Sequence, residues 1–283
     1  AISKVNSVAL ELLPDIVEDT LFVFEEQNLM AGLVAQFTGT GMASRHIGQY
    51  PTADAQDVGE GVDFSDPTDV TKELKTTLTP STKMAQTVLT DERVATDRED
   101  ARGAAATILG LALARKVDTD LLSNFSSFDA DKGTAGSALT IRRVAAGMAV
   151  LRNNKVPNPV YCVAHPFGWF DIWVELGQPE VNQAFLGDLA NQAMRDYFVG
   201  NWLNAQWYTS AHIAVDSNDD AVSGLFHREA IALDTRRGVN IEPERDASLR
   251  AWELNATVWY AHNVNRSEAG VALTHDATEP TGV

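Results

Sequence analysis

The chain has 283 residues, 45% of them hydrophobic and six of them tryptophan, which is enough to bury one large core or two smaller ones. Its net charge of -17 argues against binding of nucleic acid or anionic lipid by the free chain, because both would be repelled. The single cysteine, Cys162, excludes an internal disulfide and indicates a reducing compartment. No apolar run reaches membrane-spanning length, and the first residues lack the basic flank of a signal peptide, so we expect no membrane association.

Residues 1–40 are predicted to form an N-terminal arm. Pro14 interrupts any early helix, and the apolar residues between positions 16 and 37 have a patchy helical spacing. Gly39 and Gly41 are expected to end that helix.

Residues 42–51 and 70–89 are predicted to be the two legs of a long hairpin, since the second leg is rich in threonine and alternates apolar with polar residues. A plain solvated loop is the alternative for the segment between them. Its six acids have no base among them: Asp54, Asp57, Glu60, Asp63, Asp66 and Asp69. Three basic pairs elsewhere are either solvated or partner sites for this acidic tip: Arg115-Lys116, Arg142-Arg143 and Arg236-Arg237.

Residues 96–124 are predicted to form one long helix. Thr96 and Glu99 match a capping box, and the segment is rich in alanine and leucine. At about 1.5 Å per residue such a helix would exceed the width of a small domain, which suits an extended subunit. An apolar residue recurs every four positions and marks the expected buried stripe: Ala105, Leu109, Leu113, Val117, Leu121 and Phe125.

The remaining segments alternate between helix and strand. Thr140 should begin a helix whose buried face carries Ile141, Val144, Met148 and Leu151, and a frayed tail should begin at Thr274. Further helices are expected at 167–176 and 179–196, and strands at 160–163, 206–215, 224–233 and 249–264.

A search for chemistry predicts no catalytic, cofactor-binding or metal-binding residues. Cys162 and His165 could form a thiol–base pair, but positions three apart on a strand face opposite sides. Residues 216–220 begin like a calcium loop, yet the sixth position is Ala221 and the twelfth is His227. The six histidines lack zinc spacing: His46, His165, His212, His227, His262 and His275.

The order and wording of several segments resemble the major capsid proteins of tailed bacteriophages, which have the Hong Kong 97-like fold. GQYPTADAQDVGEGVDF at 48–64, followed by TKMAQTVLTDERVATDREDARGAAATILGLALARKVDTDLL at 82–122, resembles the family's extended loop and spine helix. LTIRRVAAGMAVLRNNKVPNPVYCVAHPFGWFDIW at 139–173 resembles the start of its axial domain. GLFHREAIALDTRRGVNIEPERDASLRAWELNATVWYAHNVN at 224–265 resembles the return into its peripheral domain.

The resemblance implies an α+β fold with an N-terminal arm (1–40), an extended hairpin loop (41–89), a peripheral domain with the spine helix (90–135), an axial domain (136–240), and a return to the peripheral domain with the C-terminal tail (241–283). It implies a structural protein, not an enzyme, that forms the hexamers and pentamers of an icosahedral head around double-stranded DNA and is assembled in the bacterial host cytoplasm. Portal, scaffolding and decoration proteins are the further partners expected. Some family members crosslink a loop lysine to an asparagine, and Lys72, Lys75 and Lys83 lie near the loop, but nothing in the sequence assigns that chemistry here.

Two alternatives remain open at this point. One is an encapsulin-type bacterial compartment shell, which would hold protein cargo. The other is a small-molecule enzyme that uses Cys162 or the histidines.

Overall fold

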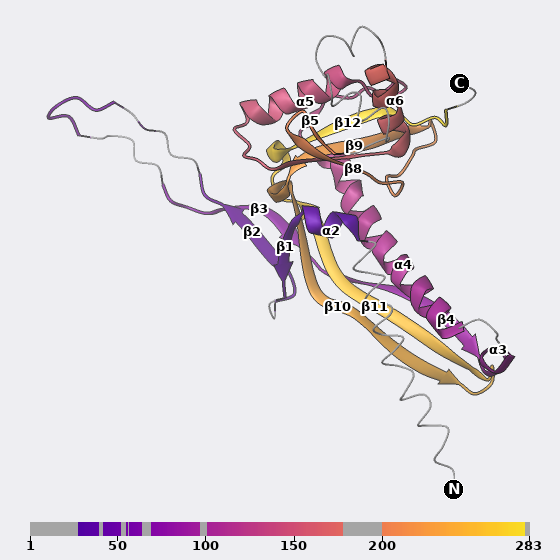
Figure 1. Ribbon diagram of the computed structural model, residues 1–283. Helices are drawn as coiled ribbons and strands as arrows, with labels where there is room; N and C mark the ends of the chain where they lie inside the picture. The colour runs from indigo at the N-terminus through magenta and orange to yellow at the C-terminus, as the bar shows by residue number, and fades with distance from the viewer. Residues whose placement is uncertain are drawn as a thin grey trace.

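The computed structural model describes residues 28–39, 42–51, 55, 57–63, 69–96, 101–177 and 200–280. A compact body and an elongated body are joined by one long helix, and a narrow hairpin projects from the side (Figure 1). The predicted helix at 179–196 and most of the predicted arm lie outside the described residues.

The elongated body is a twisted sheet of long strands. Its two central strands are antiparallel and pair over almost their whole length, and a short parallel strand and a ten-residue antiparallel strand flank them. The order is β1 (Ala35–Thr38), β10 (Ile231–Asp246), β11 (Ala251–Val264) and β4 (Ser81–Thr90).

Helix α4 (Ala101–Leu122) runs along one face of this sheet and reaches the compact body (Figure 1). Its 22 residues span about 33 Å. The predicted stripe is confirmed, because every member from Ala105 to Phe125 is buried, the last of them in the short helix η1 (Ser123–Ser127). Tyr260 of β11 donates a hydrogen bond of 2.7 Å to Asp120, which ties the helix to the sheet.

The predicted start of the long helix is wrong. Thr96 lies within helix α3 (Asp91–Thr96), where its hydroxyl donates to the carbonyl of Glu92, so it is not a helix cap. That hydroxyl is therefore used inside α3, where acids at Asp91 and Glu92 occupy the first turn. Glu99, the other predicted capping-box residue, lies outside the described residues.

The compact body is a six-stranded mixed sheet with helices α5 (Ile141–Asn153) and α6 (Pro166–Gly177) (Figure 1). Thr140 caps α5 as predicted, since its hydroxyl accepts from the backbone N–H of Arg143. Glu175 of α6 accepts from the N–H of Ile141, which places negative charge at the N-terminus of α5. The strand order is β5 (Ala130–Asp131), β12 (Gly270–Asp276), β9 (Asp220–His227), β6 (Val160–Ala164), β8 (Ala205–Thr209) and β7 (Asn201–Trp202).

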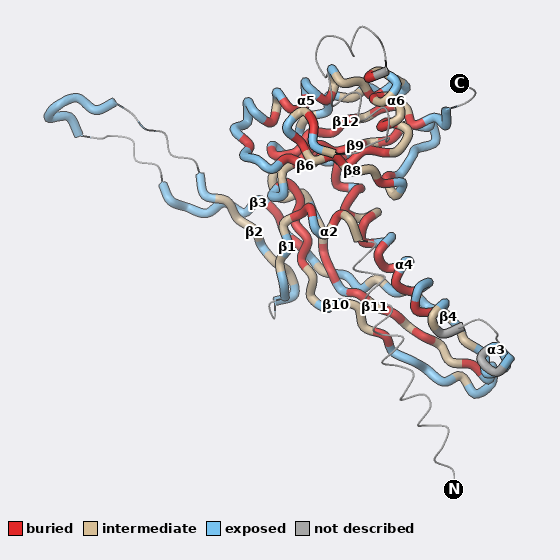
Figure 2. Tube along the Cα trace, viewed as in Figure 1, coloured by how far each residue is buried: buried red, intermediate tan, exposed pale blue. Residues whose placement is uncertain are grey.

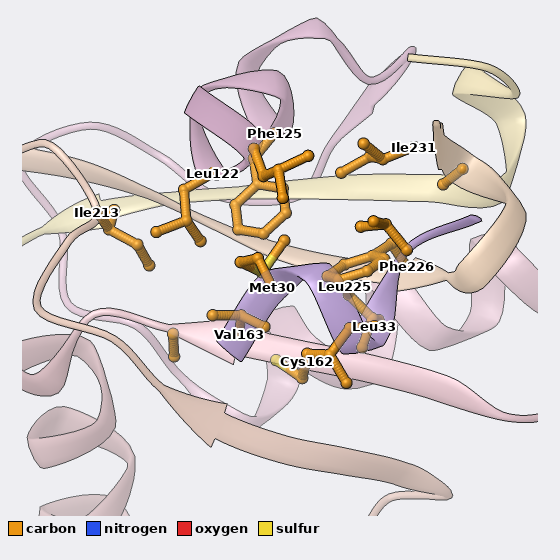
Figure 3. Packing of buried hydrophobic residues seen from close by; sticks show 14 of the residues in the cluster. Met30, Leu33, Leu122, Phe125, Cys162, Val163, Ile213, Leu225, Phe226 and Ile231 are labelled. Carbon is orange, nitrogen blue, oxygen red and sulfur yellow. The ribbon is translucent and has the colours of Figure 1, made fainter. Parts of the chain in front are cut away.

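One apolar core runs through both bodies (Figure 2). Phe125 and Phe226 meet where α4 enters the compact body, with ring centroids 5.3 Å apart (Figure 3). A Cβ at Gly224 would lie 2.6 Å from the ring of Phe125, so glycine at this position allows the close approach.

Only the end of the predicted arm is described, and its predicted helix through Phe37 is wrong. The chain forms the five-residue helix α2 (Leu29–Leu33) and then β1, which contains Phe37. The carboxylate of Asp118 on α4 accepts from the N–H groups of Leu29 and Met30 at 3.2 and 3.0 Å, so α2 is fixed to α4.

Three strand predictions need correction. The segment 70–89 divides after Leu78, because β3 (Glu73–Leu78) pairs with β2 (Arg45–Gln49), whereas β4 pairs with β11. The segment 224–233 divides at the short helix η3 (Arg228–Ala230), which passes the chain from the compact sheet to the elongated one. Of the strand predicted at 206–215, only the first part forms a strand, β8, which ends at Thr209. The strand predicted at 249–264 is confirmed as β11.

The tail does not fray at Thr274 as predicted. Strand β12 continues to Asp276 and pairs with β9, and His275 is completely buried. Asp131 accepts hydrogen bonds from both the side chain and the backbone of Thr274.

Candidate assembly surfaces

The hairpin of β2 and β3 carries the acidic segment away from both bodies (Figure 1). Every described residue from position 50 to position 75 is exposed, including Val58 and Val62. Of the six predicted tip acids, Asp54 and Asp66 lie outside the described residues. The other four are all exposed: Asp57, Glu60, Asp63 and Asp69. Equal charges at these positions repel one another, which favours a basic partner.

The root of the hairpin is fixed to the sheet by the completely buried carboxylate of Asp234 on β10. Arg45 Nε lies 3.2 Å from Asp234 Oδ1, and Arg236 Nε lies 2.9 Å from Asp234 Oδ2. Arg45 also donates to the carbonyl of Thr38 at 2.6 Å and stacks over Phe37. A buried carboxylate needs such partners, so this cluster holds the hairpin base against β1 and β10.

A small apolar cluster supports the same root. Leu78 of β3 is buried against Ala232 and Ala261, with Phe37 and Ile47 packed around them. The hydroxyl of Thr76 donates a 2.7 Å hydrogen bond to the carbonyl of Val264. The hairpin is therefore anchored at its base and exposed beyond it.

The outer face of α4 carries a second apolar stripe. Ile108 is 57% exposed and Leu111 is 39% exposed, and Ala104 and Arg115 continue the line at helical spacing. A helix with apolar residues on opposite faces is typical of a helix covered on both sides. This outer stripe is therefore a candidate contact surface.

The opposite face of the elongated sheet is also uncovered in the isolated chain. Met84 and Val88 of β4 and Trp259 of β11 alternate with residues that face α4, and all three are exposed. Both broad faces of the elongated body thus present apolar side chains to solvent.

The three basic pairs differ in their availability. Arg236 is nearly buried against Asp234, and Arg143 donates to the carbonyls of Ser137 and Ala138. Arg236 and Arg143 are thus engaged within their own subunit, and the alternative that the basic pairs meet the acidic tip is limited to the other members. The exposed members that remain are Arg115, Lys116, Arg142 and Arg237, of which Lys116 also bonds Asp120 at 2.7 Å and Arg237 lies 4.0 Å from Glu242.

Cys162 and three of the histidines lie in surroundings that disfavour their charged forms. Cys162 is completely buried on β6, and burial raises the pKa of its thiol far above the ordinary value. Burial likewise lowers the pKa values of His165, His262 and His275, which keeps these imidazoles neutral. The carboxylate of Asp216 accepts from the N–H groups of Asn218 and Asp220, so this segment is a turn, as predicted.

The described residues contain no group of three or more histidine, cysteine or acidic side chains placed to hold a metal ion. Among them no helix combines the length and apolarity needed to cross a bilayer.

The ion cluster of Asp234, Arg45 and Arg236 at the base of the hairpin was not predicted from the sequence. Asp234 is a single acid among apolar strand residues, which is a signal of a buried, paired charge. Its partner Arg45 lies nearly two hundred positions earlier, so no local pattern could connect the two.

Comparison with known proteins gives one family and a set of related folds. Residues 73–273 match the family described as phage capsid protein, which is well over half of the chain. The comparison with curated proteins finds no match.

Solved structures of viral shells share the fold. A chain of Mycobacterium phage Che8 is 19% identical with a TM-score of 0.69, covering 87% of this chain and 90% of that one. The mature capsid of bacteriophage PhiM1 gives 14% identity and a TM-score of 0.64, covering 89% and 88%. The virus-like particle of Pyrococcus furiosus gives 10% identity and a TM-score of 0.61, covering 90% and 96%.

Two of the expectations from the sequence are thereby confirmed, the α+β fold class and the capsid resemblance. The exposed hairpin and the uncovered faces of the elongated body agree with a subunit that is completed by its neighbours. The chain therefore belongs to the phage capsid protein family and is a tailed-phage major capsid protein with the Hong Kong 97-like fold.

Proposed function

We propose that the subunit forms the hexamers and pentamers of an icosahedral shell that encloses double-stranded DNA. The observation that carries this proposal is the hairpin, which is anchored by a buried ion cluster at its root and exposed along its described length beyond. An element built in this way gains stability only when another subunit covers it. Rotational symmetry then repeats the contact until the assembly closes.

The acidic tip is proposed to lie on the outer stripe of α4 in a neighbouring subunit. Val58 and Val62 supply apolar contacts for Ile108 and Leu111, which are exposed in the isolated chain. The tip carboxylates then approach Arg115, which is exposed at the end of that stripe. Both apolar burial and charge complementarity favour this pairing.

The predicted domain names are part of the same proposal. The elongated body with α4 is assigned to the peripheral domain (90–135 and the return at 241–283), and the compact body is assigned to the axial domain (136–240). Strand pairing supports this division for β6, β8, β9 and β11. It differs from the predicted bounds at β10, which lies in the elongated sheet from Ile231 onward, and at β4, which lies in the same sheet although the prediction placed it in the loop. Strand β12 carries the end of the chain back into the compact sheet.

Further partners and the site of assembly also remain proposals. Portal, scaffolding and decoration proteins are expected to contact the shell, and packaged DNA is expected to meet its inner face without sequence specificity. Assembly is placed in the host cytoplasm, and no catalytic role is proposed. The net charge of -17 favours a container wall over a DNA clamp, because tight DNA binding depends on basic groups that displace counterions.

A compartment shell that holds protein cargo is the second candidate. The fold shared with the virus-like particle of Pyrococcus furiosus does not distinguish the two functions, because one fold can serve both. The two functions differ in what the shell contains.

Electron microscopy of the purified protein tests the first half of the proposal. Closed particles are expected, and a protein that sediments only as a compact monomer at every salt concentration would overturn it. Particles isolated from the producing host are then treated with nuclease and opened. Protected double-stranded DNA supports the head, whereas protein cargo without DNA supports the compartment.

A further inference from the structure

An open cavity of about 420 Å³ lies between α2, α4 and the elongated sheet. Its floor is apolar, formed by Val117 of α4, Leu233 of β10, and Val258 and Tyr260 of β11. The volume falls in the range of sites that hold a ligand or a few side chains, about 300–1,000 Å³. An apolar hollow of this size is stabilised when apolar groups fill it.

Glycine makes room in this cavity. Gly32 and Gly238 line it, and a Cβ built at either position has no heavy atom within 4 Å. The space over both residues is therefore open. The rim of the cavity is polar, in contrast to its apolar floor. The polar rim residues are Asn28, Gln36 and Thr235.

The chain enters the described structure at the wall of this cavity. Asn28 lines the cavity and caps α2, because its side-chain oxygen accepts from the N–H of Ala31. Asp118 fixes the two residues that follow through their backbone N–H groups. The point from which the preceding segment starts is therefore held in place.

The preceding segment has one purely apolar run close to that point. Residues 21–24 read Leu-Phe-Val-Phe, and acids stand on both sides of the run at Asp19, Glu25 and Glu26. Three residues separate Phe24 from Asn28, so the end of the run lies within four residue steps, or about 14 Å, of the cavity wall. A tether that short gives the run a local concentration in the millimolar range, which favours its own chain over a neighbour.

We propose that residues 21–24 of the same chain occupy this cavity and seat their apolar side chains on its floor. The flanking acids Asp19, Glu25 and Glu26 then lie at the polar rim, in contact with solvent. This inference does not rest on shell formation, because both partners belong to one subunit.

Paired cysteines in the full-length chain test the proposal. The test variant carries Phe24→Cys and Gly238→Cys, and Gly238 suits the substitution because its surroundings are open. The matched control carries Phe24→Cys and Thr257→Cys, since Thr257 precedes the floor residue Val258 and faces the other side of the sheet. Native Cys162 is buried, so it does not compete for oxidation.

Under mild oxidation at low protein concentration, the test variant is expected to form an intrachain disulfide that mass spectrometry locates between positions 24 and 238. The control should crosslink at least tenfold less. A covalent dimer through the same two positions would show that a neighbour's segment is the occupant, and would overturn the proposal. Equal crosslinking in test and control, or none in either, would also overturn it.

Discussion

Cys162 lies on the central part of β6 with none of its surface exposed, and burial raises the pKa of its thiol. We predict that the native protein does not react with a thiol reagent at pH 8, because the thiolate is the reactive species and the thiol is shielded. The unfolded chain should react at once, which provides the control. Fast labelling of the native protein would contradict the buried placement.

Cys162→Ala should leave assembly unchanged. The substitution removes one sulfur atom from a small buried strand, and changes of this size lower the free energy of unfolding by about 1 kcal/mol. Denaturant unfolding and electron microscopy measure the two effects. Loss of particles with a normal free energy of unfolding would give the thiol a role beyond packing.

The burial of His275 leads to a prediction of how the free energy of unfolding depends on pH. This residue is completely buried, its Nδ1 lies 3.0 Å from the carbonyl oxygen of Leu273, and burial lowers its pKa below 6.5 despite the nearby acids Asp171, Asp220 and Asp276. The folded state therefore keeps the imidazole neutral while the unfolded chain binds a proton near pH 6.5. Its contribution is intact above pH 6.5 and is lost as the pH falls below that value.

The free energy of unfolding is accordingly expected to fall between pH 7.5 and pH 5.5. His275→Gln should make this decline shallower without removing it, because burial also lowers the pKa values of His165 and His262. Urea titrations at the two pH values measure the slope. An unchanged slope in the variant would show that His275 does not carry the effect.

At the scale of the element, α4 presents two faces with different tasks. Leu113 is 1% exposed on the inner stripe, whereas its neighbour Ala112 is exposed. Leu113→Asp is predicted to abolish soluble folding, because it leaves a buried carboxylate without a partner. Ala112→Asp places the same charge one position away and should remain soluble. Circular dichroism and sedimentation of the two variants decide the point, and a soluble, native-like Leu113→Asp protein would place the stripe in water.

Elements with a strong internal period could be predicted from sequence, namely α4, α5 and β11, because one buried face repeats at 3.6 or 2 residues. The breaks between elements could not. The sequence on both sides of η3 favours strands, and what separates β9 from β10 is pairing with β12 in one case and β11 in the other. The same holds for β3 and β4, whose partners lie in different sheets.

The hairpin anchor gives a prediction of its own. Asp234→Ala removes the carboxylate that pairs Arg45 and Arg236, and breaking a buried charge cluster of this kind costs about 3–5 kcal/mol. Glu242→Ala is the matched control, because its ion pair with Arg237 is exposed and 4.0 Å long, worth at most about 1 kcal/mol. Hydrogen exchange of β2 and β3 should rise sharply in the first variant only. Equal protection in both would remove the cluster from the anchoring role.

For the whole molecule, the exposed hairpin was within reach of sequence reasoning, because acids without bases and glycine-rich turns mark a segment that cannot bury itself. The Asp234 ion cluster that anchors the hairpin and the exposed apolar stripe on α4 could not be predicted from the sequence. The outer stripe uses Ile108 and Leu111, which by themselves look like ordinary members of an apolar helix. Only the position of α4 against β4 and β11 shows which side of it remains uncovered.

The last prediction concerns the acidic tip. Deleting residues 57–66 and closing the gap with a short Gly-Ser link should spare subunit folding but prevent stable shells. The described part of the tip offers only Val58 and Val62 as apolar groups, both exposed, so it adds little to the core of its own subunit. Each exposed ion pair to a neighbour is worth about 0.2–1 kcal/mol, but a shell repeats the contact at every subunit.

A full-length variant with Asp57→Asn, Glu60→Gln and Asp63→Asn separates charge from shape. If the carboxylates matter, this variant should assemble less completely at low salt, and added salt should weaken wild-type shells, because screening acts over about 10 Å at 0.1 M. Circular dichroism and electron microscopy at several salt concentrations measure both effects. Normal shells from the deletion would refute an intersubunit role for the tip, and loss of native secondary structure in the deletion would place the tip in the subunit's own core.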